Sequence, residues 1–143
     1  MTESSNEYTF EQIKIGDTVK FTEKINQEKL DSFATISGDH NPLHVNESYA
    51  ANTKFKKRVC HGMLLASFFS KLVGMRMPGK NALYFSQTLN FQEPCYVGDE
   101  ITIQGEVIDK SDSIRMITIK TLIHNHEGKC LVDGVAKVIV RQD

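Results

Sequence analysis

The pattern of hydrophobic and polar residues predicts one strand and two helices in the first part of the chain. Apolar and polar positions alternate from Thr18 to Ile25, which predicts a strand. Asn26 is a favourable N-cap for the next segment, whose apolar residues fall at helical spacing up to Gly38. Gly38 can end that helix in a left-handed conformation. We predict a loop over 39–45 and then a short helix from Asn46 to Ala51.

The middle of the chain predicts one buried helix, and the remainder predicts a sheet. The stretch from His61 to Met75 is apolar nearly all round, and such a helix should be buried on every face. After a turn at Pro78–Gly79 the pattern changes to period two, with strands near 83–92, 100–109, 114–126 and 129–140. Short links between strands favour an antiparallel meander. We therefore predict an α+β fold of the hot-dog type, in which an antiparallel sheet wraps a long central helix. Because one such sheet rarely covers a helix completely, a homodimer is expected.

Composition narrows the functional class. The 143 residues fit a polar tail over 1–16 and a single domain over 17–143. A net charge of −1 gives no basic excess for nucleic acid. The three widely spaced cysteines form neither a disulfide framework nor a zinc pattern, and the polar N-terminus does not resemble a targeting segment. These features favour the cytoplasm. The longest apolar stretch is too short to span a bilayer, so no membrane partner is expected.

Four residues with reactive or hydrogen-bonding side chains gather in the loop after the first helix: Asp39, His40, Asn41 and His44. A carboxylate and an imidazole that converge on one water suit general acid–base chemistry. Pro42 stiffens the loop and helps to hold Asp39 and His44 in a fixed relation. The alternative is that these residues only form a turn, since Asp, Asn and Pro are common turn residues.

A metal site is a further hypothesis, because Asp39, His40, His44 and His61 all have side chains that can bind a metal ion. Their spacing matches no established zinc pattern, and activation of water by Asp and His needs no metal. We predict that no metal is bound.

A second group of candidate residues opens the buried helix. The first amides of a helix lack internal partners and carry partial positive charge, and Gly62 would let a ligand carbonyl approach them closely. This arrangement suits an oxyanion hole, although Gly62 could instead serve tight packing. Cys60 is interpreted as a core residue or bystander. A basic run lies just upstream: Lys54, Lys56, Lys57 and Arg58. It is either a solvated loop or a contact for the phosphates in the nucleotide part of a ligand such as coenzyme A.

These residues resemble the MaoC-like, or hydratase-2, family, and in particular its short, stand-alone (R)-specific enoyl-CoA hydratases. The segment from Gly38 to His44 fits the family pattern Gly-Asp-x-Asn-Pro-Leu-His at every fixed place. The later segments HGMLLASFFS and YFSQTLNFQEPCYVGDE resemble the family's central helix and following strands. The similarity covers nearly the whole chain after about Gly16.

The resemblance implies a catalytic pair, Asp39 and His44, supported in their loop by Asn41 and Pro42, with the Gly62 amide in an oxyanion hole. It implies a homodimer that acts on an acyl-CoA thioester without a metal or redox cofactor, coenzyme A being part of the substrate. The expected reaction is reversible hydration of a trans-2-enoyl-CoA to the (R)-3-hydroxyacyl-CoA. Spacing along the buried helix adds Ser70 and Val73 as small residues that could line an acyl pocket.

Three rival functions stay open at this point. Hot-dog folds also host acyl thioesterases and hydroxyacyl-carrier-protein dehydratases, and many members of those families place an Asp or Glu on the central helix. Residues 61–77 contain neither, which argues against both. A non-catalytic acyl-CoA-binding module would not need Asp39 and His44 together.

Overall fold

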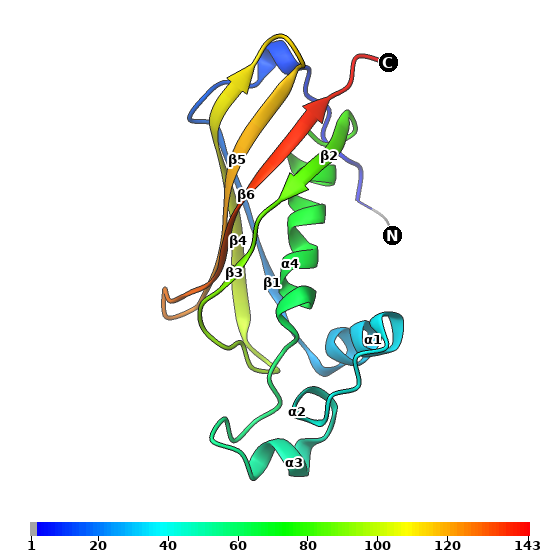
Figure 1. Ribbon diagram of the computed structural model, residues 1–143, viewed down its shortest axis with the longest axis vertical. Helices are drawn as coiled ribbons and strands as arrows, with labels where there is room; N and C mark the ends of the chain where they lie inside the picture. Colours follow the sequence, from blue (N-terminus) through cyan, green and yellow to red (C-terminus); the bar gives the residue numbers. More distant parts are fainter. Residues whose placement is uncertain (1–2) are drawn as a thin grey trace.

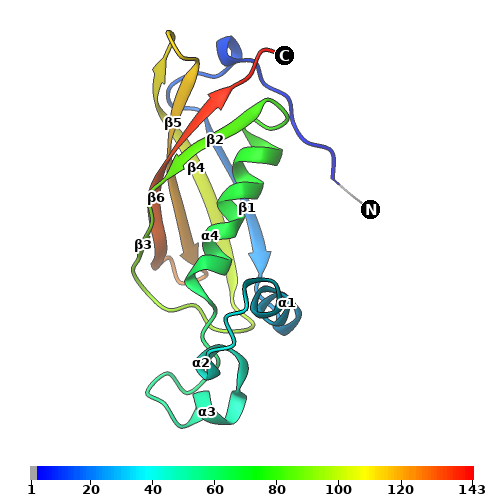
Figure 2. The same ribbon diagram turned by 45° about the vertical axis from the view of Figure 1, so that its right-hand side comes forward.

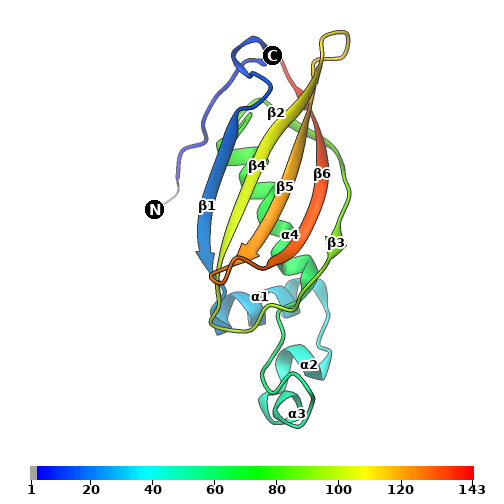
Figure 3. The same cartoon turned by 90° about the vertical axis from the view of Figure 1, so that its left-hand side faces the viewer.

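The computed structural model describes residues 3–143, and an antiparallel sheet curved around one helix forms its main body (Figure 1). The strands lie in the order β1-β4-β5-β6-β2, and β3 pairs separately with β6. Figure 3 shows this sheet from its outer side, with the helix behind it. The strands are β1 (Thr18–Lys24), β2 (Ala82–Gln87), β3 (Asn90–Phe91), β4 (Glu100–Ser111), β5 (Met116–Asn125) and β6 (Cys130–Val140).

The central helix is α4 (Gly62–Lys71), which continues without a break into the π-helical segment η2 (Leu72–Arg76). The backbone N–H of Met77 donates to the carbonyl of Leu72 at 3.0 Å, the five-residue spacing of a π-turn. The helix crosses the concave face of the sheet (Figure 2). The predicted arrangement of a long sheet wrapped around a central helix is confirmed.

Three further helices lie beyond one end of the sheet, beside the start of α4 (Figures 1 and 2). These helices are α1 (Gln27–Ser37), α2 (Pro42–Val45) and α3 (Glu47–Ala51). The side chain of Asn26 caps α1 by accepting the Lys29 amide at 2.9 Å, and Gly38 ends α1 with a φ of 78°. Both predicted ends of α1 are confirmed.

The loop predicted over 39–45 contains one short helix, so that expectation needs correction. Asn41 accepts the Leu43 amide at 3.0 Å, and Pro42 occupies the first helical position, where a missing N–H is harmless. Asn-Pro is therefore a helix start here rather than only a stiff turn.

The strand predicted over 83–92 is also two strands in the structure. The register against β6 shifts between Tyr84 and Ser86, and pairing stops after Gln87. The hydroxyl of Thr88 then accepts the Val135 amide at 2.9 Å, so a side chain replaces the backbone acceptor of the ladder. Pairing resumes at β3, which faces Val132 and Asp133 of β6.

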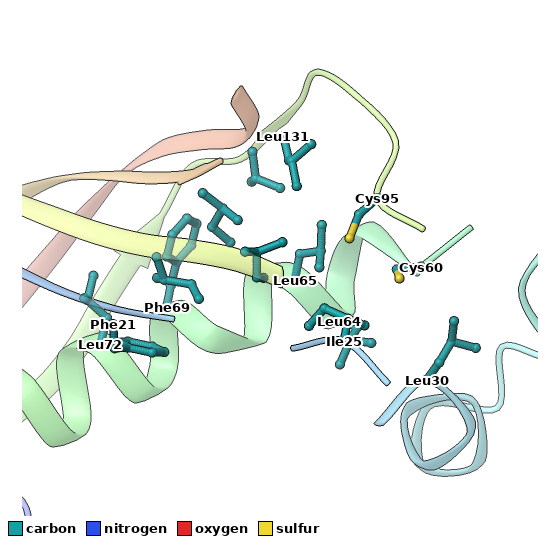
Figure 4. Close-up of a cluster of buried hydrophobic side chains, with 14 residues drawn as sticks. Phe21, Ile25, Leu30, Cys60, Leu64, Leu65, Phe69, Leu72, Cys95 and Leu131 are labelled. Carbon is teal, nitrogen blue, oxygen red and sulfur yellow. The ribbon is translucent and has the colours of Figure 1, made fainter. Parts of the chain in front are cut away.

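Alternating residues of the strands meet the apolar face of α4 to form the core (Figure 4). Leu64, Leu65, Phe69 and Leu72 of the helix and its continuation pack against isoleucines of β4 and β5. Burying a side chain of this kind contributes about 1.5–3 kcal/mol. The helix is therefore fixed against the sheet along its length.

A second part of the core joins the far end of the helix to the N-terminal segment. Phe10, which begins the turn η1 (Phe10–Gln12), and Ile13 are buried against Val73 and Met77. Residues 1–16 were expected to form a polar tail, yet these two apolar side chains belong to the core. Their spacing of three residues among polar neighbours was too short a pattern to predict burial.

One stripe of α4 is not covered within the single chain. Met63, Ser67 and Ser70 are exposed, although the helix was expected to be buried on every face. None of the helices that the structure describes is long and apolar enough to cross a membrane.

Candidate active site

Asp39 follows directly on the glycine that ends α1, and local hydrogen bonds fix its backbone and side chain. Its amide donates to the Ser37 hydroxyl at 3.1 Å, and its Oδ1 accepts the Asn41 amide at 3.2 Å. The side chain is 50% exposed, so water reaches the carboxylate freely. Its remaining oxygen, Oδ2, faces His44.

His44 lies on α2, where the helix turns its ring towards Asp39. Its Nδ1 lies 2.6 Å from the carbonyl oxygen of Val59. Because a carbonyl only accepts, Nδ1 carries the proton and Nε2 of the neutral ring offers a lone pair. This Nε2 lies 4.0 Å from Oδ2 of Asp39, and the His44 side chain is only 17% exposed. The two groups predicted to act as a pair do face each other.

Asn41 and Pro42 support this geometry through the backbone. They start the helix that carries His44, and Asn41 also holds Oδ1 of Asp39. Both residues predicted as loop support therefore connect the two members of the pair.

Arg58 fixes the same helix from the other side, a role that sequence reasoning missed. Its Nε donates to the carbonyl of His44 at 2.6 Å, and its Nη2 forms an ion pair with Asp31 at 2.5 Å. Because Arg58 is buried and binds His44 and Asp31, it is not available to a phosphate. The exposed lysines of the predicted basic run, Lys54, Lys56 and Lys57, stay candidates for that contact.

Gly62 is the first residue of α4, and no side chain caps this helix start within residues 3–143. The first amide of the helix with an internal acceptor is that of Leu64, which donates to the His61 carbonyl at 3.1 Å. The amides of Gly62 and Met63 come before it, so within residues 3–143 they are free donors at the positive end of the helix. A Cβ built at Gly62 would come within 2.7 Å of the Phe91 ring. The Gly62 N–H is thus free to donate, whereas a side chain at this position would clash with Phe91.

A cavity of about 450 Å³ adjoins this helix start. Both His44 and Gly62 line it, which brings the predicted base and the predicted oxyanion donor to one space. Most of its remaining wall is apolar and includes Phe55, Leu65, Phe91 and Leu131. The cavity can therefore hold an apolar group beside a polar reaction centre.

His61 is a second imidazole in the site, which the sequence suggested only as a metal ligand. Its Nε2 donates to the carbonyl of Asp39 at 3.0 Å, and its ring stacks on that of His44 at 3.9 Å between centroids. The side chain is 2% exposed, and this burial lowers the pKa of His61 below its usual 6.5. Its position next to Gly62 was the one signal that could have indicated a role.

Asp39, His44 and His61 also bring one possible ligand atom each within 4.8 Å of one another. His40, the fourth predicted ligand type, is exposed and outside this group. The imidazoles of His44 and His61 are inclined by only 27°. Their in-plane lone pairs therefore run side by side and do not converge on a point about 2.1 Å from each nitrogen, as a metal requires.

The other predicted residues lie away from this centre. Val73 is buried against Phe10 and Ile13, Ser70 is exposed, and neither lines the cavity beside Gly62. Cys60 is buried and interacts with the thiol of Cys95, which together with burial raises the pKa of the Cys60 thiol. A protonated, buried thiol fits the interpretation of Cys60 as a core residue.

Comparison with known proteins places this geometry in a family. The model of the MaoC like domain matches residues 10–127. The chain belongs to the MaoC-like family. It is 37% identical over 126 residues to the (R)-specific enoyl-CoA hydratase of Aeromonas caviae, covering 88% of this chain and 94% of that protein. It is 39% identical over 131 residues to the (R)-specific enoyl-CoA hydratase of Rhodospirillum rubrum, covering 92% and 90%.

Solved structures agree with this assignment. The R-hydratase PhaJ1 from Pseudomonas aeruginosa, in its unliganded form, superposes with a TM-score of 0.93. It is 32% identical, and the match covers 97% of this chain and 89% of that one. The predicted family and the predicted hot-dog fold are both confirmed.

Proposed function

We propose that this MaoC-like protein hydrates trans-2-enoyl-CoA thioesters to (R)-3-hydroxyacyl-CoA, and dehydrates the product in the reverse direction. The observation that carries the proposal is the pairing of Asp39 and His44 beside a helix start with free amides. The hydratase names of two relatives that match most of this chain support the same reaction.

The distance between the two groups suits a shared water molecule. The 4.0 Å from Nε2 of His44 to Oδ2 of Asp39 is too long for a direct hydrogen bond. Two acceptors that each lie about 2.8 Å from one water oxygen are about 4 to 4.6 Å apart. The pair can therefore accept both protons of one water and direct its lone pair outward.

Hydration then needs one proton to leave that water and one to reach the substrate. The water oxygen forms a bond to C3, one O–H bond breaks, and Nε2 of His44 takes the proton. The electrons of the C2–C3 double bond move into the thioester as an enolate. The same proton then passes to C2, which completes the addition of water and restores the pair.

The enolate oxygen is the point where negative charge develops. The free amide of Gly62, at the positive end of α4, is proposed to donate to that oxygen. The apolar cavity beside it takes the first part of the acyl chain. Neither step uses a metal or redox cofactor, and we propose that none is required.

The single chain also leaves an edge that a second copy would cover. Strand β2 ends the sheet, and its Leu83 and Phe85 are 52% and 65% exposed. An exposed apolar edge strand is a ready site for pairing with another chain. We propose a homodimer in which β2 strands extend the sheet. A cytoplasmic location stays a prediction from the sequence.

The test of the proposed reaction is the loss of enoyl absorbance when the purified protein meets crotonyl-CoA. We expect Asp39→Asn and His44→Ala each to lower kcat/KM by at least about a hundredfold, the scale of general acid–base catalysis. His40→Ala, in the same loop but exposed, is the matched control and should retain activity. Near-wild-type hydration by either folded variant of the pair would refute the mechanism.

Further measurements test the configuration of the product and separate the rival functions. An (S)-specific 3-hydroxyacyl-CoA dehydrogenase coupled to the reaction should give no signal, and a stoichiometric signal would refute the (R) product. Comparing crotonyl-CoA with the same acyl group on acyl carrier protein tests the carrier-protein dehydratase, which we consider the weaker candidate. Release of free coenzyme A would instead indicate a thioesterase, and binding without turnover would indicate a non-catalytic module.

A further inference from the structure

His61 occupies the N-cap position of α4 but does not cap the helix. Residues at this position commonly accept a hydrogen bond from the second or third helical amide. The His61 side chain makes no such bond and is turned instead towards the loop that carries Asp39. The first turn of the helix therefore keeps its free donors, and the imidazole is used elsewhere.

The contacts of the ring connect it to both members of the catalytic pair. Its Nε2–H holds the main-chain carbonyl of Asp39 at 3.0 Å, and its face stacks on His44. Phe33 of α1 packs against the same ring at 4.9 Å, inclined by 58°. The imidazole is thus clamped between α1 and α2, and any shift in it moves the backbone of Asp39 or the plane of His44.

The second ring nitrogen of His61 is left without a partner. Nδ1 is buried and accepts no hydrogen bond from the residues that the structure describes. A buried acceptor without a hydrogen bond destabilises a protein by about 1–3 kcal/mol. An unpaired Nδ1 at this position therefore indicates a role other than stability. Protonating Nδ1 would place a buried cation beside His44 and Arg58, with Asp39 the facing anion, and burial holds the pKa of His61 low.

We propose that His61 is a positioning residue, whose hydrogen bond to the Asp39 carbonyl and stacking on His44 fix these two residues at the separation needed for a shared water. The proposal rests on the function proposed above. A neutral ring at this place can hold the Asp39 carbonyl without competing with His44 for the proton of the water. An Asn or Ser at the same position would bond the free amides that the enolate requires.

Two substitutions separate the hydrogen bond from the stacking. His61→Phe keeps a ring against His44 but loses the donor to Asp39, whereas His61→Gln keeps an N–H donor and loses the ring. Misplacement of a catalytic group by about 1 Å can lower a rate by about a hundredfold. We expect His61→Phe to lower kcat for crotonyl-CoA about ten- to a hundredfold, with KM changed less than about threefold.

We expect His61→Gln to recover part of that loss, since it restores the bond to the Asp39 carbonyl. The matched control is His126→Phe, an exposed histidine paired only with Glu127 in the loop after β5, and it should leave kcat unchanged. A folded His61→Phe with wild-type kcat would overturn the proposal, as would a change confined to KM.

A measurement on the unaltered protein keeps the proposal testable if these variants do not fold. Nitrogen-15 NMR should show His61 as the Nε2–H tautomer, protonated only at a pH below the 6.5 of a free imidazole. Protonation of His61 near pH 6.5 would overturn the proposal, and so would loss of activity on chelation with recovery on adding a metal. If the unaltered protein fails to hydrate any enoyl-CoA, the proposed function fails, whereas the NMR result still decides the state of His61.

Discussion

The two ends of the central helix have opposite characters. At its start, the amides of Gly62 and Met63 and one nitrogen of His61 have no partner among residues 3–143, and a cavity adjoins the backbone. At its far end, Val73 and Met77 are packed against the N-terminal segment. Arg76 Nε, at the far end, is also buried without a partner among residues 3–143. The free amides and the cavity, however, lie at the start, and because such features lower stability they mark the place where function opposed packing.

The strongest test of this contrast is the start of the helix. We expect Gly62→Ala to lower kcat/KM at least about a hundredfold, because the new Cβ blocks access to the amide and losing one oxyanion-hole donor has an effect of that size. A Cβ at Gly62 would meet the Phe91 ring at 2.7 Å, so packing alone could explain a defect.

The double variant Gly62→Ala/Phe91→Ala distinguishes the two explanations. Removing the ring relieves the clash, and thermal stability should return to that of Phe91→Ala alone. We expect activity to stay low, because the Cβ still obstructs the approach to the amide. Recovery to the activity of Phe91→Ala would mean that Gly62 serves packing only.

The second test introduces a phenylalanine near each end of the central helix, one at the cavity and one in the far core. Leu131, at the cavity, and Val73, in the far core, are both buried, and each can be replaced by Phe. We expect Leu131→Phe to spare hydration of a four-carbon enoyl-CoA and to depress that of an eight-carbon one. Each methylene excluded from an apolar site costs about 0.8 kcal/mol, roughly a fourfold loss.

Val73→Phe tests the acyl pocket that the sequence predicts along Ser70 and Val73. Because Val73 packs against Phe10 and Ile13, we expect a loss of about 1–3 kcal/mol in the free energy of unfolding. Both substrates should then lose activity equally. A selective loss on the eight-carbon substrate would instead show that the acyl chain runs to the far end of the helix.

The same contrast explains what the sequence could and could not predict. The positions of Asp39, His44 and Gly62 in the fold were predictable because short-range signals surround them: a helix-ending Gly38, an Asn41 cap and an apolar run. These signals act within a few residues and survive folding. The resemblance to the family motif then suggested a joint role, which stays a prediction.

Contacts between distant segments were not predictable in this way. The sequence predicts that Arg58 belongs to a basic run on the surface, yet it is buried and forms an ion pair with Asp31, 27 positions earlier. Phe10 reads as part of a polar tail, yet it packs on Val73. In both residues a long-range partner decides the environment, and no local pattern encodes that partner.

The smallest expected effect concerns the pH dependence of stability, which should come from the site end of the helix. Burial lowers the pKa of His61 below the 6.5 of a free imidazole, and Asp39, His44 and Arg58 are the charged or titratable groups around it. Between those two pKa values the unfolded chain binds more protons than the folded one, so stability rises with pH. The contribution is complete above about pH 6.5 and is lost as the pH falls towards the folded pKa.

We therefore expect the free energy of unfolding in urea to fall more for the unaltered protein than for His61→Gln between about pH 7.5 and 5.5. Each tenfold change in proton affinity corresponds to about 1.4 kcal/mol, which sets the scale of the difference. Parallel pH profiles for the two proteins would show that His61 titrates normally in the folded state, and the polar end of the helix would then lack the neutral imidazole that its geometry requires.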